Sequence, residues 1–239
     1  MDFFCRDCRV VDSELPPQTT SLIPRRRQPL KMRLLHSLGL LQPLIRRYVL
    51  SKARTEYQFS RRHLQFLERD GSSVPIVHFP LMNPSRSTLI VYSHGNGSDL
   101  NNVYHLARRL YELYGVAVVA YDYTGYGESR QERGSFEEDI RTVLAWVVSK
   151  GYHPGRIVLA GFSLGSYPTL LLDSIMPRVL IAPISGLTSF VEGDIAHFEQ
   201  EPMDNILAAK RLNCRVFMVH STDDSVSVEH SRLLYHALT

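Results

Sequence analysis

The chain is predicted to form an α/β domain with a mostly parallel sheet and helices on both faces. Three observations predict it: short apolar runs alternate with amphipathic segments, a G-x-S-x-G pattern directly follows one such run, and 44% of the 239 residues are hydrophobic. Strands that alternate with helical segments of roughly 12–17 residues are typical of crossover units, which place successive strands in parallel. We expect this domain at residues 56–239, after a basic arm at residues 1–55.

The expected strands and helices follow in a regular order. An antiparallel hairpin opens the domain, because two β-type runs flank Asp70-Gly71, which is a strong turn signal. The second helix begins with a capping box of Ser135 and Glu138, and the third is expected to be interrupted near Pro168. Parallel strands are expected at residues 88–93, 116–121, 156–161, 178–185 and 214–220, and helices at 101–115, 135–151, 163–175 and 227–238.

Ser163 is the candidate nucleophile. It is the central residue of the sequence Gly161-Phe-Ser163-Leu-Gly165, between a predicted strand and a predicted helix. A serine on such a sharp turn presents its hydroxyl at the carboxyl edge of a sheet. The two glycines permit the strained backbone of the turn and the close approach of helix and strand.

A loop of small residues, HGNG, follows the strand predicted at 88–93. A tetrahedral intermediate of acyl transfer needs backbone N–H donors for its oxyanion. We expect one donor from Leu164, which follows the nucleophile, and the other from this loop, with Asn96 favoured over Gly97. The place of His94 at the start of the motif favours a structural role, in which the imidazole holds the loop by hydrogen bonds.

Two aspartates follow the strand predicted at 214–220. An acid at this position would orient a catalytic histidine and stabilise its charged form. Asp224 is the favoured acid and Asp223 the alternative, while either could instead cap a turn or the last helix. The glycine-rich stretch YDYTGYGES at 121–129 lacks the spacing of a phosphate-binding loop, and we interpret it as a structural loop at the rim of the site.

The catalytic histidine is not identified. In this architecture the triad follows the chain order Ser, Asp or Glu, His, so the histidine should come after Asp224, beyond one further strand. Only His230 and His236 follow, and both lie in the predicted last helix, which packs on the flank of the sheet. His236 remains a weak candidate from geometry, and the sheet is expected to lack its last strand and helix.

Four motifs together resemble the α/β-hydrolase family: YSHGNGSDL, YDYTGYGES, GFSLGSYPTLLLDS and HSTDDSV. The resemblance covers residues of about 60–239 and is strongest to the α/β-hydrolase-domain depalmitoylases, membrane-bound serine hydrolases that cleave palmitoyl thioesters from proteins. It implies that Ser163 is the nucleophile, Asp224 the triad acid, and the backbone of Asn96 and Leu164 the oxyanion donors. Ser221 departs from the glycine of the family's HGTxD motif, and the family's C-terminal Gly-His motif has no counterpart here. Neither a cofactor nor a metal is expected.

Two classes of function follow. The first is a serine hydrolase that cleaves an acyl ester or thioester, with an acylated protein as one class of substrate. The alternative is a truncated, catalytically impaired protein of the same fold that acts by binding, or an incomplete gene product. Removing one triad member typically leaves only about 10³–10⁴-fold catalysis over water, so the missing histidine decides between the two.

The arm carries eleven lysines and arginines against four acidic residues. Residues 22–54 are expected to contact an anionic membrane surface, and the arm shows no nucleic-acid-binding module. Its longest apolar stretch, at 34–45, is shorter than the roughly 20 residues that span a bilayer. Three cysteines form no disulfide framework, which favours a cytoplasmic protein, peripheral on the membrane. Cys5 and Cys8 are weaker candidates for acylation.

Overall fold

The computed structural model describes residues 55–69, 71–129, 134–172, 175–192 and 203–238, together with the short segments 2–5, 25–27, 29–31, Arg33 and 197–198. Most of the segment expected to contact a membrane, at 22–54, lies outside the described residues, as does Cys8. No helix in the part of the chain that the structure describes is both long enough and apolar enough to cross a bilayer.

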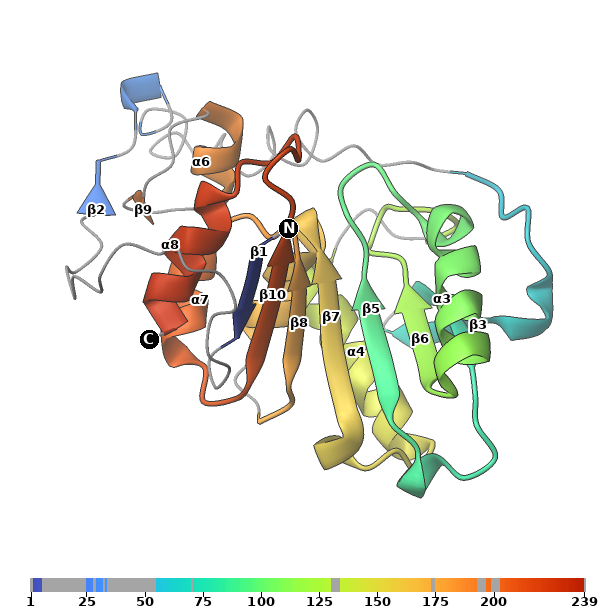
Figure 1. Cartoon of the computed structure of the whole chain (residues 1–239). Helices are drawn as coiled ribbons and strands as arrows, with labels where there is room; N and C mark the ends of the chain where they lie inside the picture. The colour runs from blue at the N-terminus through green and yellow to red at the C-terminus, as the bar shows by residue number, and fades with distance from the viewer. Residues whose placement is uncertain are drawn as a thin grey trace.

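The fold is built on one mixed, mostly parallel sheet, as the sequence predicts (Figure 1). The order across it is β1-β10-β8-β7-β5-β6-β4-β3, and neighbours from β10 to β6 are parallel, while the hairpin β3-β4, the pair β4-β6 and the pair β1-β10 are antiparallel. The strands are β1 (Asp2–Cys5), β3 (Leu64–Arg69), β4 (Ser72–Phe79), β5 (Leu89–Ser93), β6 (Ala117–Tyr121), β7 (Ile157–Phe162), β8 (Arg178–Ile181) and β10 (Val216–His220). A separate short parallel pair joins β2 (Arg25–Arg26) to β9 (His197–Phe198).

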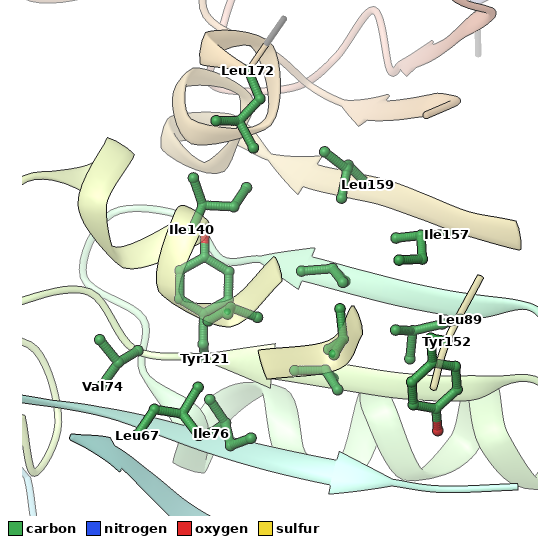
Figure 2. Packing of buried hydrophobic residues seen from close by; sticks show 14 of the residues in the cluster. Leu67, Val74, Ile76, Leu89, Tyr121, Ile140, Tyr152, Ile157, Leu159 and Leu172 are labelled. Carbon is green, nitrogen blue, oxygen red and sulfur yellow. The ribbon is translucent and has the colours of Figure 1, made fainter. Parts of the chain in front are cut away.

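Helices cover both faces of this sheet. The side chains of each strand point alternately to the two faces, and apolar side chains on both faces pack against helices. In β6, Val119 and Tyr121 pack with Ile140 in one cluster, whereas Val118 packs with Val103 in another. Figure 2 shows the first cluster, where side chains of the sheet gather against those of α4. The helices are α3 (Leu100–Tyr114), α4 (Phe136–Ser149), α5 (Ser166–Leu171), α6 (Leu187–Glu192), α7 (Asn205–Arg211) and α8 (Glu229–Leu238).

Local signals in the sequence set the ends of several elements. The hairpin turns at Gly71, which has a left-handed φ of 78°, and α3 ends at Gly115, with a φ of 60°. The capping box predicted at the start of α4 is confirmed: the Ser135 side chain accepts from the Glu138 N–H, and the Glu138 carboxylate accepts from the Ser135 N–H. These contacts satisfy backbone groups that have no partner within the helix.

The expected break near Pro168 is wrong. The chain leaves β7 through a 3-10 turn, η5 (Ser163–Gly165), and then forms α5 without interruption. Pro168 lies in the first turn of α5, where a proline is tolerated because the missing N–H costs little. The short α5 is held at its other end by the buried Arg178 of β8, whose guanidinium donates to the carbonyl oxygens of Thr169 (2.7 Å) and Leu172 (2.8 Å).

Candidate active site

Ser163 lies where β7 turns into α5, at the carboxyl edge of the parallel strands (Figure 1). Its φ is +49°, in the left-handed region that a residue with a side chain rarely adopts. The residue is partly exposed, while Leu164 directly after it is buried. A strained, partly exposed serine between a strand and a helix is the geometry of a nucleophile elbow.

The two glycines of the motif provide space for this turn. A Cβ on Gly165 would overlap the carbonyl oxygen of Ser93 and lie 2.6 Å from its carbonyl carbon. A Cβ on Gly161 would overlap the carbonyl oxygen of Gly165 itself and lie 2.6 Å from the Thr169 hydroxyl oxygen. Gly165 has an ordinary helical φ of −61°, so the strained backbone belongs to Ser163 and the glycines serve close approach.

The HGNG loop lies directly against the turn that carries Ser163. Its strand, β5, runs parallel to β7 in a register that pairs Ser93 with Gly161. A Cβ on Gly95 would lie 2.8 Å from the Phe162 ring, and Asn96 is exposed beyond this contact. The structure therefore brings the segments of Asn96 and Leu164 to the same edge, and their role as oxyanion donors stays a prediction.

His94 is buried beneath this loop and makes structural contacts. Its Nδ1 donates to the carbonyl oxygen of Gly95 at 2.9 Å, and its Nε2 lies 3.3 Å from Asp122 Oδ1. The imidazole also packs against the Tyr123 ring, with centroids 4.2 Å apart, and the Tyr123 hydroxyl donates to the His94 carbonyl oxygen at 2.6 Å. This arrangement supports the structural role that the sequence predicts for His94.

The stretch at 121–129 supplies the partners of that loop. Burial raises the pKa of Asp122, while the neighbouring His94 and the Tyr57 hydroxyl act in the opposite direction. The Tyr126 hydroxyl donates to the Asn96 side-chain oxygen at 3.1 Å. These contacts agree with the interpretation of 121–129 as a structural loop at the rim of the site.

The two candidate acids lie in the loop after β10, at the same edge of the sheet. Asp224 is partly buried, and its Oδ1 accepts from the Val226 N–H at 2.8 Å, as an aspartate in a turn does. Asp223 is exposed, and a hydrogen bond from the Ser221 hydroxyl lowers its pKa. Asp224 is the less exposed of the two, and its role as triad acid stays a prediction.

Both histidines that follow Asp224 lie in α8, the last helix that the sequence predicts. His230 is buried at the start of α8, and its Nδ1 accepts from the Ser185 N–H at 3.1 Å, so the proton of the neutral ring is on Nε2. Burial, with a smaller contribution from His220, lowers the pKa of His230 to about 4. The exposed His236 lies in the last turn of α8, which runs back along the sheet away from the carboxyl edge (Figure 1).

A third histidine beside this helix is also part of the internal framework. His220, at the end of β10, lies 2.7 Å from the Ser231 hydroxyl and 2.8 Å from the Val226 carbonyl oxygen through its two ring nitrogens. The residues that the structure describes contain no cluster of three or more histidine, cysteine or acidic side chains suited to a metal ion.

Comparison with known proteins identifies related sequences. Residues 90–235 match a family model described as "Alpha/beta hydrolase family". The chain is 29% identical over 212 residues to L404 of Acanthamoeba polyphaga mimivirus, whose name places it among the alpha/beta hydrolases, with 82% of this chain and 77% of that protein covered. It is 23% identical over 186 residues to human alpha/beta hydrolase domain-containing protein 17B, covering 72% of this chain and 64% of that protein.

Two further comparisons bear on length and fold. The alpha/beta hydrolase domain-containing protein aho-3 of Caenorhabditis elegans is 28% identical over 150 residues, which are 60% of this chain and 45% of aho-3. The chain thus spans less than two thirds of both aho-3 and protein 17B. The Pyrococcus furiosus esterase Pf2001 superimposes with a TM-score of 0.58 at 16% identity, over 79% of this chain and 84% of the esterase. That likeness shows a shared fold.

We expect Gly165→Ala to lower the free energy of unfolding by about 3 kcal/mol, because the added methyl group meets backbone that cannot rotate away. Urea unfolding of the full chain measures this change. Gly155→Ala is the matched control, since its Cβ would lie 3.2 Å from a ring nitrogen of His153, and it should cost less than about 1 kcal/mol. Equal effects of the two substitutions would contradict the close approach described above.

His230 predicts a loss of stability in mild acid. Between pH 6.5 and about 4, the unfolded chain binds a proton at this residue that the folded chain does not, so the free energy of unfolding falls as the pH falls through this window. His230→Asn keeps an acceptor for the Ser185 N–H, and it should reduce the fall in urea unfolding measured across this range. Part of the slope should remain, because burial also lowers the pKa of His78 to about 4. The exposed His236→Asn is the control, and an unchanged slope in His230→Asn would contradict the prediction.

Proposed function

Because the chain belongs to the alpha/beta hydrolase family, we propose that it is a serine hydrolase that cleaves an acyl ester or thioester with Ser163 as nucleophile. The observation that carries the proposal is the left-handed backbone of Ser163, at the edge where the strands β5, β7 and β10 end. Strain of about 1–3 kcal/mol at one residue persists only where the surrounding structure enforces it, and such residues cluster at active sites.

In the proposed reaction, the Ser163 Oγ attacks the acyl carbonyl carbon and passes its proton to a general base. The negative charge that develops on the carbonyl oxygen is stabilised by the backbone N–H groups of Leu164 and Asn96. The intermediate collapses when the bond to the alcohol or thiol breaks, and the leaving group takes the proton. Water then releases the acid from the acyl-serine, with the base accepting a proton from that water.

Asp224 is proposed to orient this base. We assign the base to none of the buried histidines. His94 and His220 contact the fold through both ring nitrogens. His230 accepts the Ser185 N–H at Nδ1, which leaves the ring proton on Nε2 and no free acceptor for a serine hydroxyl. The acid and nucleophile of the proposal therefore come from the loops after β10 and β7. The histidine that completes the triad is not assigned to a described residue.

A protein-linked acyl thioester is the substrate class that we favour. The motifs around Ser163 and Asp224 resemble those of depalmitoylases. Two exposed aromatic side chains lie beside the edge: Phe162, directly before the nucleophile, and Phe190 on α6. Apolar surface next to the proposed nucleophile suits a long acyl chain that is attached to another protein.

The basic segment at 22–54 would bring the enzyme to such a substrate at an anionic membrane surface. We expect the full chain to pellet with vesicles that contain phosphatidylserine, and to remain in solution with purely zwitterionic vesicles or at high salt. Substituting Arg25–Arg27 by glutamine should abolish pelleting, whereas glutamine at the exposed Arg108, Arg109 and Arg141 of the domain should not. Equal pelleting by both variants would contradict a role of the arm.

A fluorophosphonate probe tests the nucleophile. We expect it to label the full chain at Ser163, with loss of labelling in Ser163→Ala and unchanged labelling in Ser149→Ala, an exposed serine on α4. Asp224→Asn should slow the hydrolysis of a p-nitrophenyl acyl ester by at least about 10²-fold, while Asp223→Asn should change it less than about threefold. Mass spectrometry and absorbance measure the two effects.

The outcomes separate the two classes of function. Labelling at Ser163 without turnover of any ester would indicate a nucleophile that is acylated and not released, which favours a binding role. A folded sample that the probe does not label would contradict the proposed hydrolase.

A further inference from the structure

The segment that follows the arm contacts the framework of the proposed active site. Tyr57 is 5% exposed, although it lies beside the boundary between arm and domain. Its hydroxyl donates to Asp122 Oδ2 and accepts from the Glu128 N–H at 3.1 Å, and its own N–H donates to Glu128 Oε1 at 2.9 Å. Tyr57 is therefore fixed at both its backbone and its hydroxyl.

Asp122 carries this contact on to the HGNG loop. Its Oδ2 receives the Tyr57 hydroxyl, while its Oδ1 faces His94 Nε2 at 3.3 Å. The other ring nitrogen of His94 donates to the carbonyl oxygen of Gly95, the peptide group that leads into Asn96. A buried series of polar contacts thus runs from Tyr57 to the backbone that precedes the proposed oxyanion donor, with hydrogen bonds at its two ends and a 3.3 Å approach of Asp122 to His94 between them.

The backbone at Gly127 leaves space for the contact between Tyr57 and Asp122. Gly127 has a left-handed φ of 50°, and a Cβ on it would overlap both Asp122 Oδ2 and the Tyr57 hydroxyl oxygen. Burial, reinforced by the charge of Asp122, raises the pKa of Tyr57, so the phenol keeps its proton and remains a donor at any working pH. Because the carboxylate is desolvated, losing this donor would leave an acceptor oxygen buried without compensation.

We propose that Tyr57 is a positioning residue for the oxyanion loop, acting through Asp122 and His94 on the peptide between Gly95 and Asn96. The proposal rests on the serine hydrolase function inferred above and adds to it a residue from outside every catalytic motif of the chain. Oxyanion donors act because they are held in place before charge develops. A loop that has lost part of its support would bind substrate equally well and stabilise the transition state less.

The test compares two conservative substitutions in the full chain. Tyr57→Phe removes the hydroxyl that bonds Asp122, and Tyr152→Phe is the matched control, because the buried Tyr152 hydroxyl bonds His78 at 2.9 Å, away from the HGNG loop. The rate of Ser163 labelling is measured over a range of fluorophosphonate concentrations, which separates the maximal rate from the half-saturating concentration. Thermal unfolding of each variant is recorded in parallel.

We expect Tyr57→Phe to lower the maximal labelling rate on the order of tenfold with an unchanged half-saturating concentration, and Tyr152→Phe to leave both unchanged. Asp122→Asn should lower the rate at least as much. Adding Tyr57→Phe to Asp122→Asn should have little further effect, because residues in one chain of contacts are not additive. A merely structural tyrosine would instead change the melting temperature and leave the maximal rate of the folded fraction unchanged.

The results distinguish the positioning role of Tyr57 from the proposed serine hydrolase function. If the wild-type chain is labelled at Ser163 and Tyr57→Phe is labelled at the same maximal rate, the positioning role is wrong and the hydrolase proposal stands. Additive losses in the double variant would show that Tyr57 does not act through Asp122. If the folded wild-type chain is not labelled, the hydrolase proposal fails and the positioning role fails with it.

Discussion

The site depends on one contact between two stretches of backbone, where Gly165 meets the end of β5. No atom beyond a hydrogen fits on Gly165, because the carbonyl groups of Ser93 and His94 occupy that space. This contact sets the distance between the turn that carries Ser163 and the loop that carries Asn96. It also requires that β5 and β7 be neighbours in the sheet, which their parallel pairing provides. Chain direction, strand order and a missing side chain together bring Ser163 and the segments of Leu164 and Asn96 to one edge of the sheet.

Side chains, rather than backbone pairing, hold the loops beyond the strand ends. Asp122 lies between the HGNG loop and Tyr57. The buried Asp139 of α4 accepts two hydrogen bonds from Thr124 and forms an ion pair with Arg69 at 3.3 Å. Burying these carboxylates raises the pKa of each, so their partners offset a real cost of desolvation. A buried carboxylate that makes several contacts can hold a loop in place although the loop has no regular secondary structure. A preorganised site requires loops that are held in this way.

The sequence predicted the elements whose signals are local. Alternating apolar runs, the Gly71 turn and the capping box at Ser135 act within a few residues, and the structure contains all of them. The prediction at Pro168 was wrong because a proline interrupts a helix interior but is tolerated in the first turn, and the start of α5 was not predicted correctly. The contacts of His230 and Tyr57 could not be predicted, since their partners are far away in the sequence: Asp122 is 65 residues along the chain from Tyr57. The order of the motifs predicted that Ser163 and Asp224 lie at the carboxyl edge of the sheet. The choice between Asp223 and Asp224 as the acid depends on the geometry of the loop after β10.

In the proposed reaction, Ser163 attacks a carbonyl whose oxygen is received by the backbone N–H groups of Leu164 and Asn96. A crystal structure of the full chain after reaction with an alkyl fluorophosphonate tests it most directly. We expect phosphorus bonded to Ser163 Oγ, with the phosphonyl oxygen about 2.7–3.1 Å from the backbone nitrogens of both residues. A phosphonyl oxygen directed away from these two N–H groups, or a phosphonate attached to another residue, would contradict it.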